Sequence, residues 1–328
     1  MSVISAIIPV RNRKNYTQNI LTQIYSQLSN KNYQKKFNVI VVDDGSTDGT
    51  KELIRSQFSE VNLLEADGSL WWTGAICQGM NYAIEVLNSD YIVWLNDDIS
   101  ISEDLIDNIK EICDSPLSKE AIIGGIVRER TYPDWVVFSG MLRKKLIRSM
   151  DHFVSEKEII VDTLNGNIAV IPRTVVEKIG LPDAVRFRHY GGDFEFVSRA
   201  KKCGFKVILS SRLQATTDCQ IADFVRYMPP WMQWRIENNI FKKIKILQGF
   251  TNLKFHHNIW HMLNIIYWDY KHIPSWKYIN FYVRQVIKVI ASDFWLRSRL
   301  EGELQDYFKE QNAPQPIIDA IMSEISRK

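Results

Sequence analysis

Two pairs of adjacent aspartates are the residues of this sequence best suited to chemistry. Asp43 and Asp44 directly follow one short apolar run, and Asp97 and Asp98 directly follow another. Clustered carboxylates repel one another unless a cation or hydrogen-bond donors compensate their charge. Hard oxygen ligands suit Mg²⁺ or Mn²⁺, which bind one or two carboxylates together with substrate phosphates. A single pair would be equally compatible with turn and helix-cap chemistry, but two pairs favour a metal-assisted phosphate site.

The elements that must position these aspartates follow a strand–helix alternation. Short apolar runs rich in β-branched residues predict strands, bounded by turn residues, at Val3–Val10, Phe37–Val42, Asn62–Leu64, Tyr91–Leu95 and Ala121–Val127. Helical patterns lie between them, at about 15–29, 47–58, 74–88 and 103–113. This series predicts an open, doubly wound, mostly parallel α/β sheet that binds ligands at the carboxyl ends of its strands. Both aspartate pairs would then face one crevice.

The rhythm changes after residue 128. Shorter strands are predicted at Trp135–Leu142, Ile159–Asp162, Asn167–Ile171 and Lys206–Leu209, with a helix from Asp193 to Lys202. After Met228 the pattern is helical and amphipathic to the end. We therefore predict an α/β domain over 1–225 and a helical region over 226–328.

Three ordered motifs resemble family 2 glycosyltransferases. They are SAIIPVRNR at 5–13, VIVVDDGSTDGT at 39–50 and LNDD at 95–98, and the resemblance continues through YGGDFEF at 190–196. It covers roughly residues 3–210, and the second motif is highly specific. The resemblance implies the A-type glycosyltransferase fold, a single Rossmann-like α/β domain that binds a nucleotide-sugar.

The resemblance also implies roles for individual residues. The base and ribose of the nucleotide are expected at Pro9, Arg11, Asn12, either Asp43 or Asp44, and Asp97. Asp98 is expected to ligate the metal that bridges the diphosphate, and Asp193 matches the catalytic base. Asp193 also fits a helix N-cap, where neighbouring N–H groups would lower its pKa.

Residues around the donor sugar and the acceptor are implied in the same way. They are Trp71, Trp72, Gly74, Asn165, Gly166, Gly192 and Glu195. We expect one of the two tryptophans in the site and the other in the core, which is the commoner place for Trp. Glu195 is either a substitute acid or a residue on the helix surface, and we favour the surface.

The sequence departs from the family pattern at three places. Asn96 replaces the first aspartate of the metal motif, so it would help the metal only weakly. Gly192 stands where many relatives have Glu before the catalytic Asp. The histidine that many relatives carry after Val207–Leu209 is missing, and Asp218 is the candidate replacement as a metal ligand.

The last third of the chain is basic and aromatic. Residues 226–300 hold 12 basic and 3 acidic residues and six of the ten Trp. Amphipathic helices with Trp and Lys or Arg are typical of a bilayer interface, which predicts peripheral contact with an anionic membrane. A helical subdomain that packs on the first part or forms a homodimer explains the same residues. No nucleic-acid module is recognisable, so no nucleic acid partner is expected. His256, His257 and His261 lack a further ligand and are interpreted as surface or core residues.

Composition narrows the class of protein. The chain has 45% hydrophobic and 24% charged residues, which is typical of a folded protein. The four cysteines form no C-x-x-C pair, and no apolar run approaches the roughly 18–20 residues of a membrane span. Val3–Val10 lacks the basic flank of a secretory signal. We therefore expect a cytoplasmic protein, peripheral on the inner face of the cytoplasmic membrane.

The combined prediction is a metal-dependent, inverting glycosyltransferase with Mg²⁺ or Mn²⁺ as cofactor. It would move a sugar from a nucleotide-sugar, with a UDP-sugar favoured, to a glycan or polyprenyl-linked acceptor in bacterial O-antigen or capsule synthesis. One alternative is a nucleotidyltransferase on a related fold, although Pro9–Asn12 lacks the glycines of a phosphate loop. Another is an inactive sugar-binding or membrane scaffold protein, against which the intact Asp98 and Asp193 argue.

Overall fold

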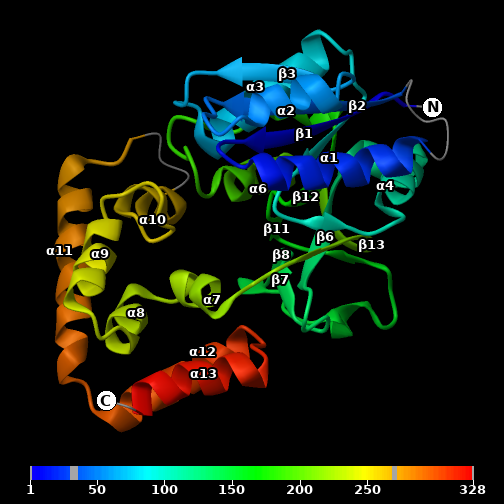
Figure 1. The fold of residues 1–328 in the computed structure, drawn as a ribbon. Coiled ribbons are helices and arrows are strands. Elements are labelled where there is room, and N and C mark those ends of the chain that lie inside the picture. The colour runs from blue at the N-terminus through cyan, green and yellow to red at the C-terminus, as the bar shows by residue number, and fades with distance from the viewer. Residues whose placement is uncertain (1, 30–35, 268–271, 327–328) are drawn as a thin grey trace. The chain divides into compact units, whose positions relative to one another are not determined.

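The computed structural model describes residues 2–29, 36–267 and 272–326, drawn in Figure 1. The chain divides into two compact units. We call the first, Met1–Arg188 with Gly192–Asp218, the sheet unit, and the second, His189–Gly191 with Cys219–Lys328, the helical unit.

The sheet unit is built on one large sheet. Its strand order is β10-β13-β6-β12-β4-β1-β2-β3, and β5 and β7 pair with β13 and β6. The strands are β1 (Ile4–Val10), β2 (Phe37–Asp44), β3 (Asn62–Ala66), β4 (Tyr91–Leu95), β5 (Ser100–Ile101), β6 (Ala121–Glu129), β7 (Val136–Phe138), β10 (Glu158–Ile160), β12 (Ile168–Pro172) and β13 (Lys206–Thr217). The neighbours β3, β2, β1 and β4 run parallel, as predicted.

One strand in the middle of the large sheet, β12, runs antiparallel to both of its neighbours. β12 pairs antiparallel with both β4 and β6, with Ile168 opposite Leu95. The start of β12 therefore lies beside the end of β4. This orientation brings residues 165–167 to the sheet edge that carries the aspartates.

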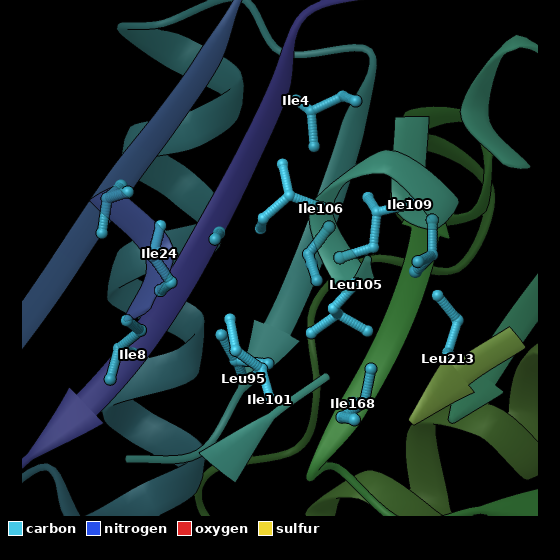
Figure 2. Packing of buried hydrophobic residues seen from close by; sticks show 14 of the residues in the cluster. Ile4, Ile8, Ile24, Leu95, Ile101, Leu105, Ile106, Ile109, Ile168 and Leu213 are labelled. Atoms are coloured by element: carbon cyan, nitrogen blue, oxygen red, sulfur yellow. The ribbon is translucent and has the colours of Figure 1, made fainter. Parts of the chain in front are cut away.

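Helices cover both faces of the sheet. They are α1 (Lys14–Ser29), α2 (Thr50–Gln57), α3 (Trp71–Glu85), α4 (Leu105–Asp114), α5 (Arg173–Ile179) and α6 (Gly192–Lys202), with 3₁₀ turns at Pro116–Glu120 and Met150–Phe153. On one face, Ile24 of α1 and Ile109 of α4 pack against Ile4 and Ile8 of β1 in one cluster (Figure 2). A second cluster joins α3, α5 and α6 to the other face. Two buried faces explain why the central strands are apolar without alternation.

Two predicted strands differ from the observed ones. The run Trp135–Leu142 is divided into β7 and β8 (Gly140–Leu142), because β8 leaves the large sheet and pairs with β9 (Lys145–Leu146) and β11 (Thr163–Leu164). β13 is twelve residues long and continues past Leu209 to Thr217, with a register shift before Gln214. That extension pairs with both β5 and β6, which no local pattern in the sequence indicates.

The helical unit confirms the predicted helical region. Its helices are α7 (Ile221–Tyr227), α8 (Pro230–Ile236), α9 (Ile240–Gly249), α10 (Ile259–Ile266), α11 (Ser275–Ala291), α12 (Arg297–Glu310) and α13 (Gln315–Ser326), with a 3₁₀ turn at Ser292–Phe294. Trp268, one of the six tryptophans of 226–300, lies outside the described residues. No helix in the described ranges is both long and apolar enough to span a bilayer.

His256, His257 and His261 of the helical unit are packing residues. His257 is buried, and its ring meets Phe250 edge-on at 5.2 Å. Burial lowers the pKa of His256 to about 3 and that of His261 to about 4, so both are neutral at pH 7. Of the two interpretations of these histidines, surface or core, the structure therefore favours the core.

Candidate active site

The two aspartate pairs lie at the same edge of the sheet. β2 and β4 flank β1 on its two sides and run parallel to it, so the residues at their carboxyl ends meet at one edge. Asp43 and Asp44 are the last residues of β2, and Asp97 and Asp98 follow β4. This is the place where open α/β sheets bind ligands.

The first pair is held by backbone donors. Asp44 is buried, and its two carboxylate oxygens accept the N–H groups of Leu70 and Trp71 at 3.1 and 2.9 Å. One oxygen of Asp43 accepts the N–H of Ser46 at 2.9 Å. Asp44 thus satisfies two N–H groups at the start of α3. Trp71 has a φ of +58°, which is rare for a bulky residue, and the Asp44 contact holds it there.

The loop after β1 is joined to the loop after β2. Asn12, at a φ of +52°, accepts the N–H of Thr47 at 2.7 Å and donates its own to the hydroxyl of Ser46 at 2.8 Å. Arg11 lies 3.7 Å from Asp44 and is half-exposed. Pro9 is paired in register with Val42. Gly49 is the N-cap residue of α2.

The second pair shares one cation. The Arg13 guanidinium lies 3.1 Å from a carboxylate oxygen of Asp97 and 3.0 Å from one of Asp98. The other oxygen of Asp97 is buried without a hydrogen-bond partner. Burial raises the pKa of Asp97 to about 7, and the nearby Arg13 opposes that rise. Asp98 keeps 42% of its side chain exposed. No role for Arg13 was predicted from the sequence.

This acidic pair fits a hard divalent cation. Its donors are carboxylate oxygens, one of them buried and unsatisfied, and the pair already holds a positive group. Within the described residues no three His, Cys, Asp or Glu side chains gather as a metal site. That is compatible with Mg²⁺ or Mn²⁺, which take one or two carboxylates and complete their shell with waters and phosphates.

A chain of amides links the metal motif to the start of β12. Asn96 accepts the indole N–H of Trp72 at 2.9 Å and donates to the side-chain oxygen of Asn167 at 2.8 Å. Asn167 in turn donates to the side-chain oxygen of Asn165 at 3.0 Å. Both polar atoms of the Asn96 side chain thus hold the loop in position. Asn167 was missed in the sequence, because only the antiparallel pairing of β12 with β4 brings it here.

Trp72 also reaches Asp193. Its ring lies directly against Gly166, whose N–H donates to a carboxylate oxygen of Asp193 at 2.8 Å. Trp72 meets Trp94 edge-on at 5.7 Å in the core. Of the two tryptophans, Trp72 is therefore the structural one. It connects the loop of Asp97 and Asp98 with the carboxylate of α6.

Asp193 has the electrostatics of a base poised near neutral pH. Burial raises its pKa to about 6, although the N–H groups of Phe194 and Gly166 lower it. The expectation that the helix N-terminus lowers this pKa is wrong, because the loss of hydration outweighs two backbone donors. A carboxylate with this pKa is ionised at pH 7 and is a stronger base than an ordinary aspartate.

Comparison with known proteins gives a family match for the first part of the chain. A family model described as Glycosyl transferase family 2 matches residues 5–135. This part of the chain is similar to glycosyltransferase family 2. The match spans β1 to the residues before β7, and it contains every residue of both aspartate pairs.

Relatives and solved structures agree with this family. The chain is 27% identical over 209 residues to the glycosyltransferase AglE of Haloferax volcanii, covering 62% of this chain and 63% of that protein. It is 22% identical over 199 residues to the low-salt glycan biosynthesis hexosyltransferase Agl10 of the same organism, covering 58% and 59%. The chain thus spans about three fifths of the length of these curated relatives.

A solved structure shares the fold. The mannosyltransferase PcManGT of Pyrobaculum calidifontis, in complex with GDP-Man and Mn²⁺, matches with a TM-score of 0.54 at 15% identity. The match covers 98% of this chain and 84% of that one. The predicted A-type glycosyltransferase fold is therefore confirmed.

The sheet unit also contains an ion pair at a position that was predicted to be on the helix surface. Glu195 is buried rather than on the helix surface, and it pairs with Arg199 at 2.7 Å. Arg199 further donates to the carbonyl oxygens of Ile179 and Leu181. Glu195 is on the buried side of α6 and anchors the preceding loop. Its charge is already compensated, which makes it a poor substitute base.

Gly192 allows close approach of the starts of α3 and α6, since a Cβ there would lie 2.4 Å from the Thr73 hydroxyl oxygen. A Cβ on Gly74 would lie 3.2 Å from Leu70, the residue just before α3. This close contact with Thr73 explains why residue 192 is Gly here and not the Glu that many relatives carry. A larger residue would push the starts of the two helices apart.

Asp218 lies near the metal motif. The hydroxyl of Thr217 donates to the carbonyl oxygen of Asp98 at 3.0 Å, which places the end of β13 beside that loop. Asp218 itself is 67% exposed and lies 3.2 Å from Arg130. An exposed ion pair of this kind contributes little to stability.

Replacing Arg13 by Gln should strengthen metal binding in the absence of nucleotide. The guanidinium competes with a divalent cation for Asp97 and Asp98, and its loss should tighten Mn²⁺ binding by about tenfold, or about 1.4 kcal/mol. Calorimetry at pH 8, where Asp97 is ionised, measures it. Arg11→Gln is the matched control and should leave the Mn²⁺ affinity unchanged. Weaker Mn²⁺ binding in the Arg13 variant would contradict this competition.

Gly166→Ala should lower stability. A Cβ there would lie 2.4 Å from the Trp72 ring, which is fixed by Asn96 and Trp94. Overpacking of this kind costs about 1–3 kcal/mol in the free energy of unfolding. Denaturant unfolding measures it, with Gly302→Ala as control, since a Cβ there meets nothing within 4 Å. An unchanged midpoint for Gly166→Ala would show that the Trp72 ring can move.

Proposed function

We propose that this chain is a metal-dependent glycosyltransferase that uses a nucleotide-sugar donor. One observation carries the proposal: Trp72 binds Asn96 of the acidic loop through its indole N–H and supports Gly166, the hydrogen-bond donor to Asp193. A cation-binding pair and a carboxylate with a raised pKa are thus fixed around one side chain. The family-model match over residues 5–135 and the shared fold support the same activity.

The proposed metal ligand is Asp98, with Asp97 beside it and Asp218 as a further ligand. Asn96 is proposed to act on the metal through the loop rather than directly, since its oxygen accepts from Trp72. Mg²⁺ or Mn²⁺ bound there would neutralise the diphosphate that leaves in the reaction. The Mn²⁺ of PcManGT, whose fold this chain shares, supports a divalent ion.

The nucleotide is proposed to bind along the loops after β1 and β2. Pro9, Arg11 and Asn12 form the first loop, and Asp43 is the better candidate of the aspartate pair because both Asp44 oxygens are engaged by α3. A carboxylate can accept the N3–H of uracil, which favours a UDP-sugar. Trp71, in its strained backbone conformation, is the proposed tryptophan of the sugar site. The other residues proposed for that site are Gly74, Asn165, Gly166 and Gly192.

Asp193 is proposed to deprotonate the acceptor hydroxyl as that oxygen attacks the anomeric carbon. A single displacement of this kind inverts the anomeric configuration. The acceptor is proposed to be a glycan or a polyprenyl-linked glycan of bacterial surface polysaccharide, an O-antigen or a capsule. The glycan biosynthesis role in the printed name of Agl10 supports a glycan acceptor. Peripheral contact with the inner face of the cytoplasmic membrane would bring the enzyme to a lipid-linked acceptor.

Thermal unfolding with UDP-, dTDP-, GDP- and CMP-sugars, each with and without Mn²⁺, tests the donor class. A ligand at a hundred times its Kd stabilises the native state by about 2.7 kcal/mol. We expect a rise in Tm for one nucleotide class, the UDP-sugars, and only with Mn²⁺. A protein whose Tm responds to none of the four would not be a nucleotide-sugar enzyme.

A further inference from the structure

One face of α11 is apolar and exposed along the whole helix. Its residues recur at intervals of three and four, the spacing of a single helix face. They are Trp276 (61% exposed), Ile279 (65%), Val283 (45%), Ile287 (60%) and Ile290 (45%). Phe294, one turn further on, is 86% exposed. We call these six side chains the α11 stripe.

The opposite face of α11 holds it in the helical unit. Val289 is buried, Tyr278 donates to the side-chain oxygen of Asn264 at 3.3 Å, and Tyr282 meets Phe250 edge-on at 6.2 Å. Within the described residues of the helical unit, the helix thus has a protein partner on one side only. In Figure 1 α11 is the long helix of this unit, drawn in orange.

The charges that α11 itself carries beside the stripe are all positive, and Asp293, the acid next to Phe294, lies 3.8 Å from Lys243. Arg284 and Lys288 are exposed and lie about a quarter turn from the apolar residues, and Lys277 lies on the same flank. α11 contains no Asp or Glu. An exposed apolar face with a basic flank is typical of a helix that lies in the interface of an anionic bilayer.

The charge pattern distinguishes a bilayer from protein partners. A second copy of α11 packed on the stripe would place basic flanks against one another with no acidic residue in the helix to pair with them. The sheet unit offers no matching apolar face in its described residues. Its exposed large hydrophobic side chains come from separate elements: Tyr16, Val86, Val154, Ile160 and Val185. Scattered residues of this kind are ordinary surface.

We propose that α11 lies in the plane of an anionic membrane, with the α11 stripe in the acyl region and Arg284 and Lys288 at the phosphate groups. This deepens the membrane contact of the proposed function and narrows it from residues 226–300 to one helix face. Lys243 of α9 is not equivalent to Arg284 and Lys288. Lys243 is 19% exposed and lies 3.8 Å from Asp293 and over the Trp234 ring, so it serves packing.

Vesicle binding of the full chain tests the proposal without donor or acceptor. We expect the protein to pellet with phosphatidylcholine vesicles that contain phosphatidylglycerol, and only weakly with phosphatidylcholine alone. The double variant Ile279→Asp with Ile287→Asp should bind about a hundredfold more weakly. Arg284→Glu with Lys288→Glu should bind about tenfold more weakly and lose its salt dependence.

The matched control places the same charges on exposed apolar residues of the sheet unit. Val154→Asp with Val185→Asp, at positions 87% and 84% exposed, should bind vesicles as the wild type does. Equal loss in both double variants, or no vesicle binding by the wild type, would overturn the proposal. So would a lower Tm or a change from dimer to monomer in Ile279→Asp with Ile287→Asp, because a protein surface would then cover the stripe. Donor-induced stabilisation with Mn²⁺ should persist in every variant, which separates this inference from the catalytic one.

Discussion

Asp98→Ala should reduce sugar transfer by about a thousandfold or more, because the Mg²⁺ or Mn²⁺ proposed to bind there would supply several kcal/mol of charge stabilisation to the departing diphosphate. Nucleotide binding should also stop responding to Mn²⁺. The fold should survive, since Asp98 is partly exposed and lies beside a second acid. Calorimetric titration of the donor nucleotide, with and without Mn²⁺, measures the loss beside steady-state transfer.

A matched control for Asp98 is available at the surface. Asp104→Ala removes an exposed carboxylate at the start of α4 and should leave transfer and metal response intact. Asp218→Ala tests the further ligand and should weaken the metal response less than Asp98→Ala does. Full activity of the Asp98 variant, or of the wild type in excess EDTA, would exclude the metal assignment.

Asp193→Asn should reduce kcat by about 10²–10⁴-fold, the usual worth of general base catalysis, with little change in nucleotide affinity. The amide is nearly isosteric but cannot accept the proton of an acceptor hydroxyl. In the wild type, kcat should fall as the pH drops below about 6, where Asp193 becomes protonated. Steady-state transfer between pH 5 and 8 measures both effects.

Stability provides the control for Asp193→Asn. A carboxylate whose pKa is raised by folding destabilises the native state at any pH above its unfolded pKa. The Asn variant removes that penalty but turns its amide NH₂ towards one of the two backbone N–H groups that donate to Asp193, so its Tm at pH 7 should lie close to that of the wild type. Wild-type turnover in this variant would remove Asp193 from the mechanism. A product that retains the donor's anomeric configuration, read by NMR, would contradict single displacement.

The arrangement of the aspartates could be predicted because it depends on local signals. The apolar run of β2 ends at Asp43 and that of β4 just before Asp97, and strand–helix alternation makes neighbouring strands parallel. In a parallel sheet all carboxyl ends share an edge, so the two pairs must meet. The antiparallel course of β12 carries no such local signal. It alone brings Gly166 and Asn167 to that edge.

Electrostatic detail also depended on the tertiary structure. Arg13 and Asp97 are 84 positions apart in the sequence, and nothing near either one predicts their contact at 3.1 Å. Glu195 has the spacing of a helix-surface residue, yet it is buried because Arg199 and the loop before α6 enclose it. The pKa of Asp193 was expected to fall and instead rises, since desolvation depends on every atom packed around a group.

Residue type and periodicity are enough to predict the alternating core elements and the position of the acids at strand ends. Only the folded structure shows which carboxylate oxygens accept hydrogen bonds from the protein and which do not. Asp44 spends both oxygens on α3, whereas Asp97 retains an unsatisfied one. It likewise decided that the face of α11 bearing Ile279 and Ile287 is exposed while the face bearing Val289 is buried. Both outcomes arise from contacts between segments far apart in the chain, whose geometry exists only after the chain has folded.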